Sequence, residues 1–408
     1  MTYSVAADLR TISLAVAILT LQVSVSCGPA DSSAAAVWRG TIDTLASGTV
    51  VVHNPATGVW DEETAWQVTE ESRIGTLQGD GPDMFGSIAA VEVDPNGRLY
   101  VFDRQALELR VFDPTGRHIR TIGREGGGPG EFKQVIGMAW GPDRKLWVVD
   151  PGNSRISSFD TSGAYVTGHR TIGNVIISPW PGGFDLEGNF YNYGIDTEAD
   201  PNRQLVLLRY NPSMEPVDTF RLPIGEREGE FFVLRSENAI MQSRVPFTAD
   251  FQWKFIPVPR PEIWVANTGE YRILQQSLEG DTVRIISRDY EHLPVTAADV
   301  EAAVEDLRWF TRQGGKIDRT RFPSTKPAIN TFFHDDVGRT WVSPVTSEED
   351  RGRIWDVFDP EGRYLGQLDL AFSLERYPTP LFRNDMIYGV TRDELDVPYV
   401  VSARIHVP

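Results

Sequence analysis

A cluster of basic side chains is the strongest candidate for a binding site in this 408-residue sequence. Residues 308–326 hold six cations and one acid, Asp318, a local charge of +5 in a chain whose net charge is −18. The cations are Arg308, Arg312, Lys316, Arg319, Arg321 and Lys326. Because arginine presents a planar fork of donors that fits a carboxylate, phosphate or sulfate group, one interpretation is a site for a small anionic ligand.

A second interpretation is that these cations form ion pairs within the protein. Acidic side chains flank the cluster on both sides and could form a complementary rim. They are Glu301, Glu305, Asp306, Glu348, Glu349 and Asp350. The sequence leaves both interpretations open.

Metal-binding patterns are weak. The six histidines are scattered, and no two have the close spacing of a local metal site. His334, Asp335 and Asp336 are adjacent and could contribute to a Ca²⁺ or Zn²⁺ site, although an Asp-rich turn is expected before Gly338 in any case. We therefore predict no cofactor, with Ca²⁺ or Zn²⁺ considered only if the protein is an enzyme.

Other catalytic patterns are missing from the sequence. It contains no G-x-S-x-G nucleophile elbow, and the glycine-rich run 123–130 is followed by strand residues, which excludes a phosphate loop at the start of a helix. The carboxylates are too many and too evenly spread to identify an acid/base pair, so the catalytic residues remain unknown.

The basic cluster follows a predicted helix. Thr296 and Asp299 resemble a capping box, and five apolar residues follow at helical spacing before Gly314 and Gly315 end the helix. The apolar residues are Val300, Ala303, Val304, Leu307 and Phe310. This helix is either a plug that packs on the rest of the fold or a lid over a ligand.

An internal repeat defines the architecture. A turn followed by an aromatic residue in an apolar strand occurs six times, each aromatic marking one copy. The aromatics are Tyr100, Trp147, Tyr191, Trp264, Trp341 and Tyr388. Three of the spacings, 47, 44 and 47 residues, match a four-stranded propeller blade, and the spacings of 73 and 77 indicate a blade plus an insertion. The insertions are placed at about 224–250 and 290–327.

The repeat predicts an all-β fold, a six-bladed β-propeller with a helical insertion between blades four and five. The expected blades are about 86–132, 133–172, 176–222, 250–290, 328–370 and 379–406. Because the last copy has only three strands, an N-terminal strand must close it, and the apolar run 48–53 within segment 40–54 is the expected one. The propeller then occupies residues 38–408.

One segment resembles a known repeat. A Gly-rich turn with Phe132, the strand Trp147–Asp150 and the Asn153-Ser154-Arg155-Ile156 sequence are similar to an NHL repeat, most closely over residues 86–166. The whole chain resembles the exported six-bladed propeller lipoproteins of bacteria, most of which have no assigned activity. Propeller lactonases and amidating lyases are similar in fold and carry metal ligands on the channel face, but those ligands do not map onto residues of this sequence.

The N-terminus resembles a bacterial lipoprotein signal. Residues 11–26 form an apolar run shorter than the roughly 20 residues of a spanning helix, and small residues precede Cys27. The similarity implies removal of residues 1–26, lipidation of Cys27 and a tether at 27–37. Ordinary secretion and an uncleaved anchor are the alternatives. The expected location is the cell envelope, on the periplasmic or outer-membrane side.

The composition of the chain excludes some classes of protein. The charge of −18 argues against nucleic-acid partners, and 11% aromatic residues argue against disorder. We expect an extracytoplasmic, monomeric binding or scaffold module for an envelope protein or a small anionic ligand, in contact with the membrane only through its lipid. The alternative is a metal-assisted hydrolase or lyase, lactonase-like or amidating-lyase-like, with its site in the central channel; whether the protein is an enzyme stays open.

Overall fold

The computed structural model describes residues 37–170, 180, 182–196, 204–223, 231–236, 239–347 and 350–408. The predicted signal segment, Cys27 and residues 28–36 of the tether lie outside the described residues, and so do Glu348 and Glu349 of the acidic rim. Residues 38–408 form one unit.

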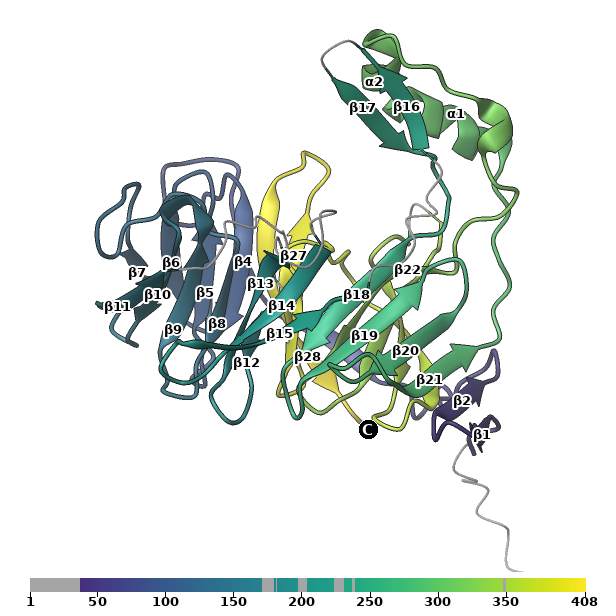
Figure 1. Ribbon diagram of the computed structural model, residues 1–408, viewed down its shortest axis with the longest axis horizontal. Helices are drawn as coiled ribbons and strands as arrows, with labels where there is room; N and C mark the ends of the chain where they lie inside the picture. Colours follow the sequence, from purple (N-terminus) through teal and green to yellow (C-terminus); the bar gives the residue numbers. More distant parts are fainter. Residues whose placement is uncertain are drawn as a thin grey trace, which may run out of the picture. The chain divides into compact units, whose positions relative to one another are not determined.

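Six antiparallel sheets account for most of the fold, and we number them as blades in chain order (Figure 1). Blade one consists of β4 (Ile88–Val93), β5 (Leu99–Asp103), β6 (Glu108–Phe112) and β7 (His118–Ile122). Blade two consists of β8 (Gly137–Trp140), β9 (Leu146–Asp150), β10 (Arg155–Phe159) and β11 (Tyr165–Arg170), with a short 3₁₀ helix at Pro151–Asn153. Blade three consists of β12 (Gly183–Phe184), β13 (Phe190–Asp196), β14 (Gln204–Tyr210) and β15 (Pro216–Arg221).

The other three blades follow the same order. Blade four consists of β18 (Phe251–Ile256), β19 (Glu262–Asn267), β20 (Arg272–Gln276) and β21 (Thr282–Arg288). Blade five consists of β22 (Ile329–His334), β23 (Thr340–Pro344), β24 (Ile354–Phe358) and β25 (Tyr364–Asp369). Blade six consists of β26 (Leu381–Arg383), β27 (Met386–Arg392), β28 (Pro398–His406) and β3 (Gln67–Ile74). The predicted six-bladed architecture is confirmed.

The strand that closes the ring differs from the predicted one. β3 pairs with β28 and supplies the fourth strand of blade six, with Val400 opposite Ile74, and β27 of this blade lies beside β4 of blade one (Figure 1). An N-terminal strand therefore closes the ring, but the run 48–53 is not that strand. This run forms β2 (Val50–Asn54), which pairs with β1 (Thr41–Thr44) and, in parallel, with β21 of blade four.

The local sequences explain this error. β3 reads QVTEESRI and alternates between exposed and partly buried residues, as an outer strand with one solvent face should. β2 is apolar because part of it is buried in the fold: Val52 and Asn54 are both fully buried. The Asn54 amide donates to the carbonyls of Ser287 and Gly362. An apolar run therefore identified a buried strand but not its partner.

The repeated aromatics join neighbouring blades. All six lie on the second strand of a blade and are buried. Ring contacts reach the first strand of the next blade in five cases, with centroid distances of 4.3–5.6 Å. These pairs are Tyr100–Trp140, Trp147–Phe184, Tyr191–Phe255, Trp264–His334 and Trp341–Phe382. The sixth, Tyr388, packs in one cluster with Ile88 and Val91 of blade one. The aromatic residues of the sequence repeat thus form the contacts between neighbouring blades.

Tight turns of the form Asp-x-x-Gly occur in the blades, and Asp113 to Gly116 is an example. In blade one the Asp113 carboxylate accepts from the backbone N–H groups of Thr115 and Arg117, each at 3.0 Å, and Gly116 has φ 85°. The Thr115 hydroxyl also donates to this carboxylate, at 2.7 Å, and together with the Arg117 N–H it lowers the pKa of Asp113 to about 2. Such turns connect the strands within the blades.

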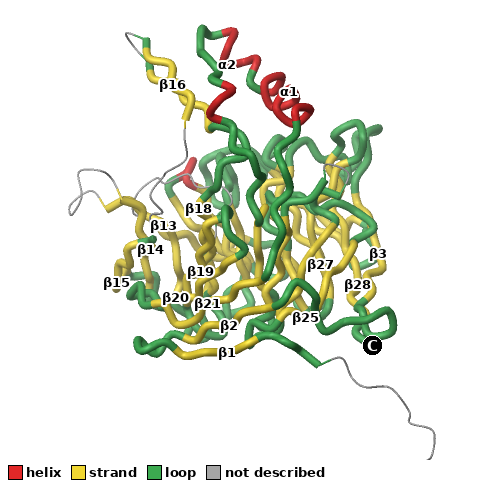
Figure 2. The backbone as a smooth tube through the Cα atoms, turned by 90° about the vertical axis from the view of Figure 1, so that its right-hand side faces the viewer, coloured by secondary structure: helices red, strands yellow, loops and turns green. Residues whose placement is uncertain are grey.

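The two insertions form one module. Hairpin β16 (Phe231–Arg235) and β17 (Ile240–Arg244) packs against α1 (Ala297–Asp306) and α2 (Arg308–Arg312), and the module stands on one side of the blades (Figures 1 and 2). The predicted capping box of Thr296 and Asp299 is present. We call residues 231–236, 239–247 and 295–322 the cap; it includes a 3₁₀ turn at Arg319–Arg321.

The cap has a core of its own. Phe232, Val245, Leu307 and Phe310 are buried together, separate from the clusters between the blades. In the described part of the chain, no helix is long and apolar enough to cross a membrane.

Candidate functional site

A pocket of about 540 Å³ lies among the first strands of the blades. Its walls include residues of β4, β8, β18, β22 and β26, and the segment 376–380 contributes a further wall. This volume is in the range of small-molecule sites. The pocket is the candidate functional site.

Strand register identifies which pocket residues depart from the repeat. In each blade one first-strand residue pairs with the repeated aromatic, so these six positions are equivalent. They are Glu92, Ala139, Gly183, Lys254, Phe333 and Leu381, in blade order. Four are small or apolar, as blade packing requires. The two ionisable residues lie in blades one and four, which are opposite blades in a ring of six.

Lys254 is a cation in an apolar setting. Its Nζ lies 4.7 Å from the centroid of the Phe333 ring, and burial together with the nearby charge of Arg376 lowers its pKa to about 7. Arg376 has a buried Nε that no group in the described chain accepts from, and its guanidinium lies over the Tyr377 ring. Within the described residues, neither cation forms an ion pair with a carboxylate.

His334 lines the same pocket as these two cations. Its ring packs against Trp264 at 4.3 Å, in the place that an aromatic ring occupies in blades two, three, four and six. Both ring nitrogens are buried and have no hydrogen-bond partner among the described residues. Burial, with the charge of Lys254, lowers the pKa of His334 to about 3. The imidazole is therefore neutral at physiological pH.

Gln252 supplies a further polar atom without a partner among the described residues, and Glu92 supplies a buried carboxylate that pairs with Arg383 but accepts no hydrogen bond from the described chain at Oε2. Burial raises the pKa of Glu92 to about 7, against the opposing effect of Arg383, whose Nη1 lies 3.6 Å from Glu92 Oε2. The amide of Gln252 donates to the carbonyl of Asn330 at 2.7 Å, and its Oε1 has no partner in the described part of the chain. Because buried polar atoms are normally satisfied, these atoms point to a polar ligand or water in the pocket.

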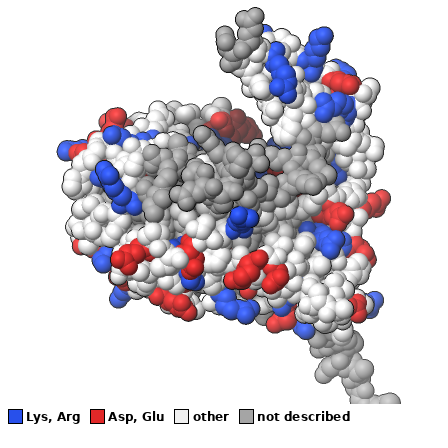
Figure 3. Space-filling model, viewed as in Figure 1, with Lys and Arg blue, Asp and Glu red and all other residues white. Residues whose placement is uncertain are grey.

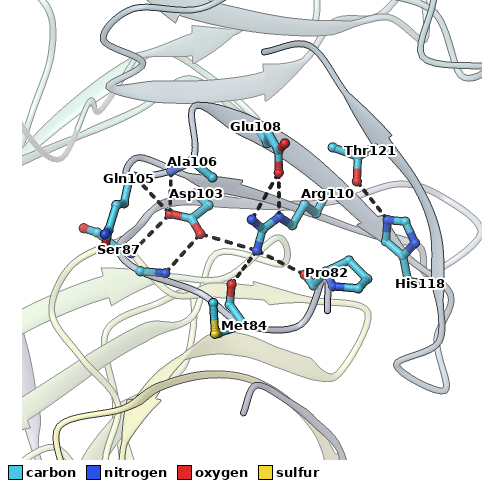
Figure 4. Close-up of polar contacts among 11 residues, drawn as sticks. Pro82, Met84, Ser87, Asp103, Gln105, Ala106, Glu108, Arg110, His118 and Thr121 are labelled. Carbon is cyan, nitrogen blue, oxygen red and sulfur yellow. Dashed lines mark hydrogen bonds and ion pairs between the residues drawn. The ribbon is translucent and has the colours of Figure 1, made fainter. Parts of the chain in front are cut away.

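A second polar network, in blade one, has every key group paired (Figure 4). The Asp103 carboxylate accepts from four backbone N–H groups, those of Gly86, Ser87, Gln105 and Ala106. Arg110 donates to the carbonyls of Pro82 and Met84 and lies 3.4 Å from Asp103. The network therefore holds the segment that leads into β4.

Blade two repeats this arrangement with the residues that resemble an NHL repeat. Asp150 accepts from the backbone N–H groups of Lys133 and Gln134, and Asn153 donates to Asp150 and to the Gly126 carbonyl. Arg155 donates to carbonyls of the Gly-rich turn. The Asn-x-Arg sequence thus has an architectural role.

Comparison with known proteins agrees with this architecture. Residues 82–206 match the model of a family described as "6-bladed beta-propeller". The match spans blades one and two and part of blade three, and the structure contains six such sheets. The chain is a six-bladed β-propeller. The search of curated proteins found no match.

Solved structures with this fold share little sequence with the propeller. A member of the duf4221 family from Bacteroides vulgatus is 11% identical, with a TM-score of 0.51, over 85% of this chain and 100% of that one. A protein from Bacteroides fragilis named as exported is 11% identical, with a TM-score of 0.49, over 87% and 99%. An inactive variant of virginiamycin B lyase from Staphylococcus aureus is 11% identical, with a TM-score of 0.42, over 83% and 99%. Such a likeness shows the fold alone.

Five members of the basic cluster lie on the cap, where basic side chains are visible, and Lys326 follows it in sequence (Figure 3). Arg308 pairs with Glu305, Arg319 with both oxygens of Glu301, and Lys326 with Asp299 at 2.7 Å. Arg321 donates to the Phe231 carbonyl. Arg312 and Lys316 are exposed. The pairing interpretation therefore accounts for most of the cluster, and its members do not converge on one point.

The predicted metal candidates serve other purposes. Asp335 accepts from the backbone N–H and the side chain of Arg339 and from the Trp341 indole, so it is a turn residue. Asp336 accepts from the Asn384 backbone. Within the described ranges, no three His, Cys, Asp or Glu side chains converge as metal ligands. Of the three candidates only His334 lines the pocket with unused polar atoms.

Sequence reasoning missed Lys254, Arg376 and Glu92. Lys254 lies in the apolar run FQWKFI and Glu92 in IAAVEV, and a charge within a fully apolar first strand was an available signal. Arg376 follows a strand in an irregular segment and carried no such signal.

Proposed function

We propose that this propeller binds a small anionic ligand, such as a carboxylate, in the pocket among its first strands. The observation that carries the proposal is the pair Lys254 and Arg376, two cations on the pocket wall with no carboxylate partner among the described residues. Two like charges in an apolar site destabilise each other unless an anion lies between them.

The pairing of the first two strands in each blade indicates that Lys254 serves a ligand site and is not needed for packing. Equivalent positions in four blades carry Ala, Gly, Phe or Leu, so the propeller fold does not require Lys254. Arg376 offers a fork that matches a carboxylate, and His334 and Gln252 offer further hydrogen-bonding atoms. These groups give the pocket both charge and directionality for a small anion.

We further propose that binding takes place outside the cytoplasm, with the chain tethered through Cys27. Support comes from the sequence, in which an apolar run ends at a lone cysteine preceded by small residues. An envelope protein as partner and a scaffold role remain compatible with this proposal. The metal-assisted enzyme alternative has no specific observation in its favour, since the candidate carboxylates are already used in turns.

Thermal denaturation with a panel of anions tests the proposal. Acetate, oxalate and phosphate are added separately to the purified protein at pH about 6.5, below the pKa of Lys254, with ionic strength held constant. A ligand at 100 times its Kd stabilises by about 2.7 kcal/mol. We expect at least one anion to raise the Tm of the wild type saturably.

Matched variants locate the site. The rise should disappear in Arg376→Gln and persist in Arg312→Gln, which removes an exposed cation of the cap. The absence of a shift with every anion, or equal shifts in both variants, would overturn the proposal.

A further inference from the structure

Lys254 has the environment of a nucleophilic amine. Its Nζ lies over the Phe333 ring, it shares the pocket wall with Arg376, and no described carboxylate pairs with it. A lysine that is desolvated or lies beside another cation keeps a large neutral fraction near neutral pH, and the neutral amine attacks carbonyl carbons. The pKa of about 7 agrees with this geometry.

Arg376 selects the kind of carbonyl compound. Its guanidinium presents a planar cationic fork to the same pocket, so it can hold a carboxylate beside the Lys254 amine. A 2-oxo acid carries its carboxylate on the carbon next to the carbonyl. The two functional groups of such a ligand therefore match an amine and a guanidinium that line the same pocket.

We propose that Lys254 forms a reversible imine with a small 2-oxo acid whose carboxylate is bound by Arg376. This inference rests on the proposed anion site and names its ligand class. The nitrogen lone pair forms a bond to the carbonyl carbon, and the C–O π pair takes up a proton to give a carbinolamine. The carbinolamine then loses its oxygen as water, which carries away the two amine protons. No oxidant, reductant or metal is required.

His334 is placed to assist proton movement in this step. His334 and Lys254 line the same pocket, and neither nitrogen of the neutral His334 ring has a hydrogen-bond partner among the described residues. A neutral imidazole can accept a proton from the attacking nitrogen. The other charged groups of the pocket wall are Glu92 and Arg383, together with Asp250, Asp335 and Asp336.

Reductive trapping tests the imine. The protein is incubated with pyruvate and sodium borohydride, and its intact mass and peptides are measured. We expect one adduct per chain, on Lys254, with a mass gain equal to pyruvate less one oxygen atom. The adduct should be lost in Lys254→Met and retained in Lys316→Met, which removes an exposed lysine of the cap.

Two further readouts keep the inference falsifiable if Lys254→Met folds poorly. In the wild type, the trapping rate should rise with pH through about 7, whereas surface lysines react through their ordinary, higher pKa. In Arg376→Gln, the pyruvate concentration needed for half-maximal trapping should rise about tenfold or more. Adducts spread over many lysines, or a rate that rises only at the ordinary lysine pKa, would overturn the inference.

Lactate, which lacks the ketone, separates this inference from the proposed function. Stabilisation by both pyruvate and lactate without an adduct would refute the imine and leave the anion site standing. If neither pyruvate nor lactate binds, and oxalate and phosphate also fail to bind, the imine and the anion site are both refuted.

Discussion

Lys254 and Glu92 occupy equivalent positions in opposite blades of the ring, each paired with the repeated aromatic residue of its own blade. The four other members of this set are Ala139, Gly183, Phe333 and Leu381. Of these six equivalent positions, four therefore hold small or apolar residues, and the two in opposite blades hold an acid and a base. Both side chains have pKa values shifted to about 7, in opposite directions, because burial disfavours the charged form of each.

The first prediction concerns the pH dependence of stability. The pKa of Lys254 falls from 10.5 in the unfolded chain to about 7 in the folded one. Between these values the unfolded chain binds more protons, so this group makes stability rise with pH from about 7 to about 10. We expect the wild type to gain on the order of a few kcal/mol relative to Lys254→Met over this window.

Urea unfolding at a series of pH values measures this difference. Lys145→Met, which removes a lysine paired with Asp143 at the surface, is the control and should show no comparable trend. A constant difference between wild type and Lys254→Met across the window would contradict the predicted burial of the charge.

The second prediction concerns the network that holds the entry to blade one. Arg110→Met leaves the buried Asp103 without its cation and the carbonyls of Pro82 and Met84 without a donor. Breaking such a buried pair costs about 3–5 kcal/mol. Arg117→Met, which removes an exposed partner of Asp113 in the same blade, should cost about 1 kcal/mol or less. Denaturant unfolding of both variants checks this, and equal costs would show that the network is not important for stability.

The third prediction concerns ring closure. Because β3 completes blade six, the amide hydrogens that it donates to β28 should exchange with solvent only as fast as the whole propeller unfolds. β1, whose four residues are all exposed, should exchange much faster. Hydrogen exchange followed by mass spectrometry compares the two strands. Fast exchange throughout β3 would mean that the ring is closed in another way.

The fourth prediction concerns the cap. Phe310 is fully buried in the cap core, and Phe→Ala changes in cores cost about 3–5 kcal/mol. Because this core is separate from the cores between the blades, we expect Phe310→Ala to make the cap (residues 231–236, 239–247 and 295–322) sensitive to protease while the blades, including blade four, stay folded. Limited proteolysis with peptide mapping checks this. Loss of the whole propeller would show that the cap and the blades unfold together.

The sequence predicted the parts of the fold that local chemistry encodes. The six aromatics and the capping box of Thr296 are short patterns, and each occurs as expected. The closing strand was wrong because β3 is a polar, alternating outer strand, whereas the apolar β2 belongs to blade four. Pairing between strands far apart in sequence is set by tertiary contacts that no local pattern contains.

Of the pocket residues that carry the proposal, the sequence singled out only His334, for a related reason. The basic cluster is conspicuous in the sequence, but surface cations are conspicuous wherever they neutralise neighbouring acids, as Arg319 does with Glu301. His334 was chosen for its neighbours Asp335 and Asp336, whose carboxylates are used in turns and backbone contacts. The cations that lack partners, Lys254 and Arg376, are 122 residues apart, and only the folded ring brings them together.

The most direct test of the anion site is calorimetric titration with oxalate, a dicarboxylate that cannot form an imine. We predict saturable binding to the wild type at pH about 6.5, where Lys254 is mostly charged. In Lys254→Met/Arg376→Gln the Kd should weaken by about 100-fold or more, since two charge-assisted contacts are lost. Arg312→Gln/Lys316→Gln removes two exposed cations of the cap and should bind as the wild type does. Equal oxalate affinity in the pocket variant and the wild type would contradict the account.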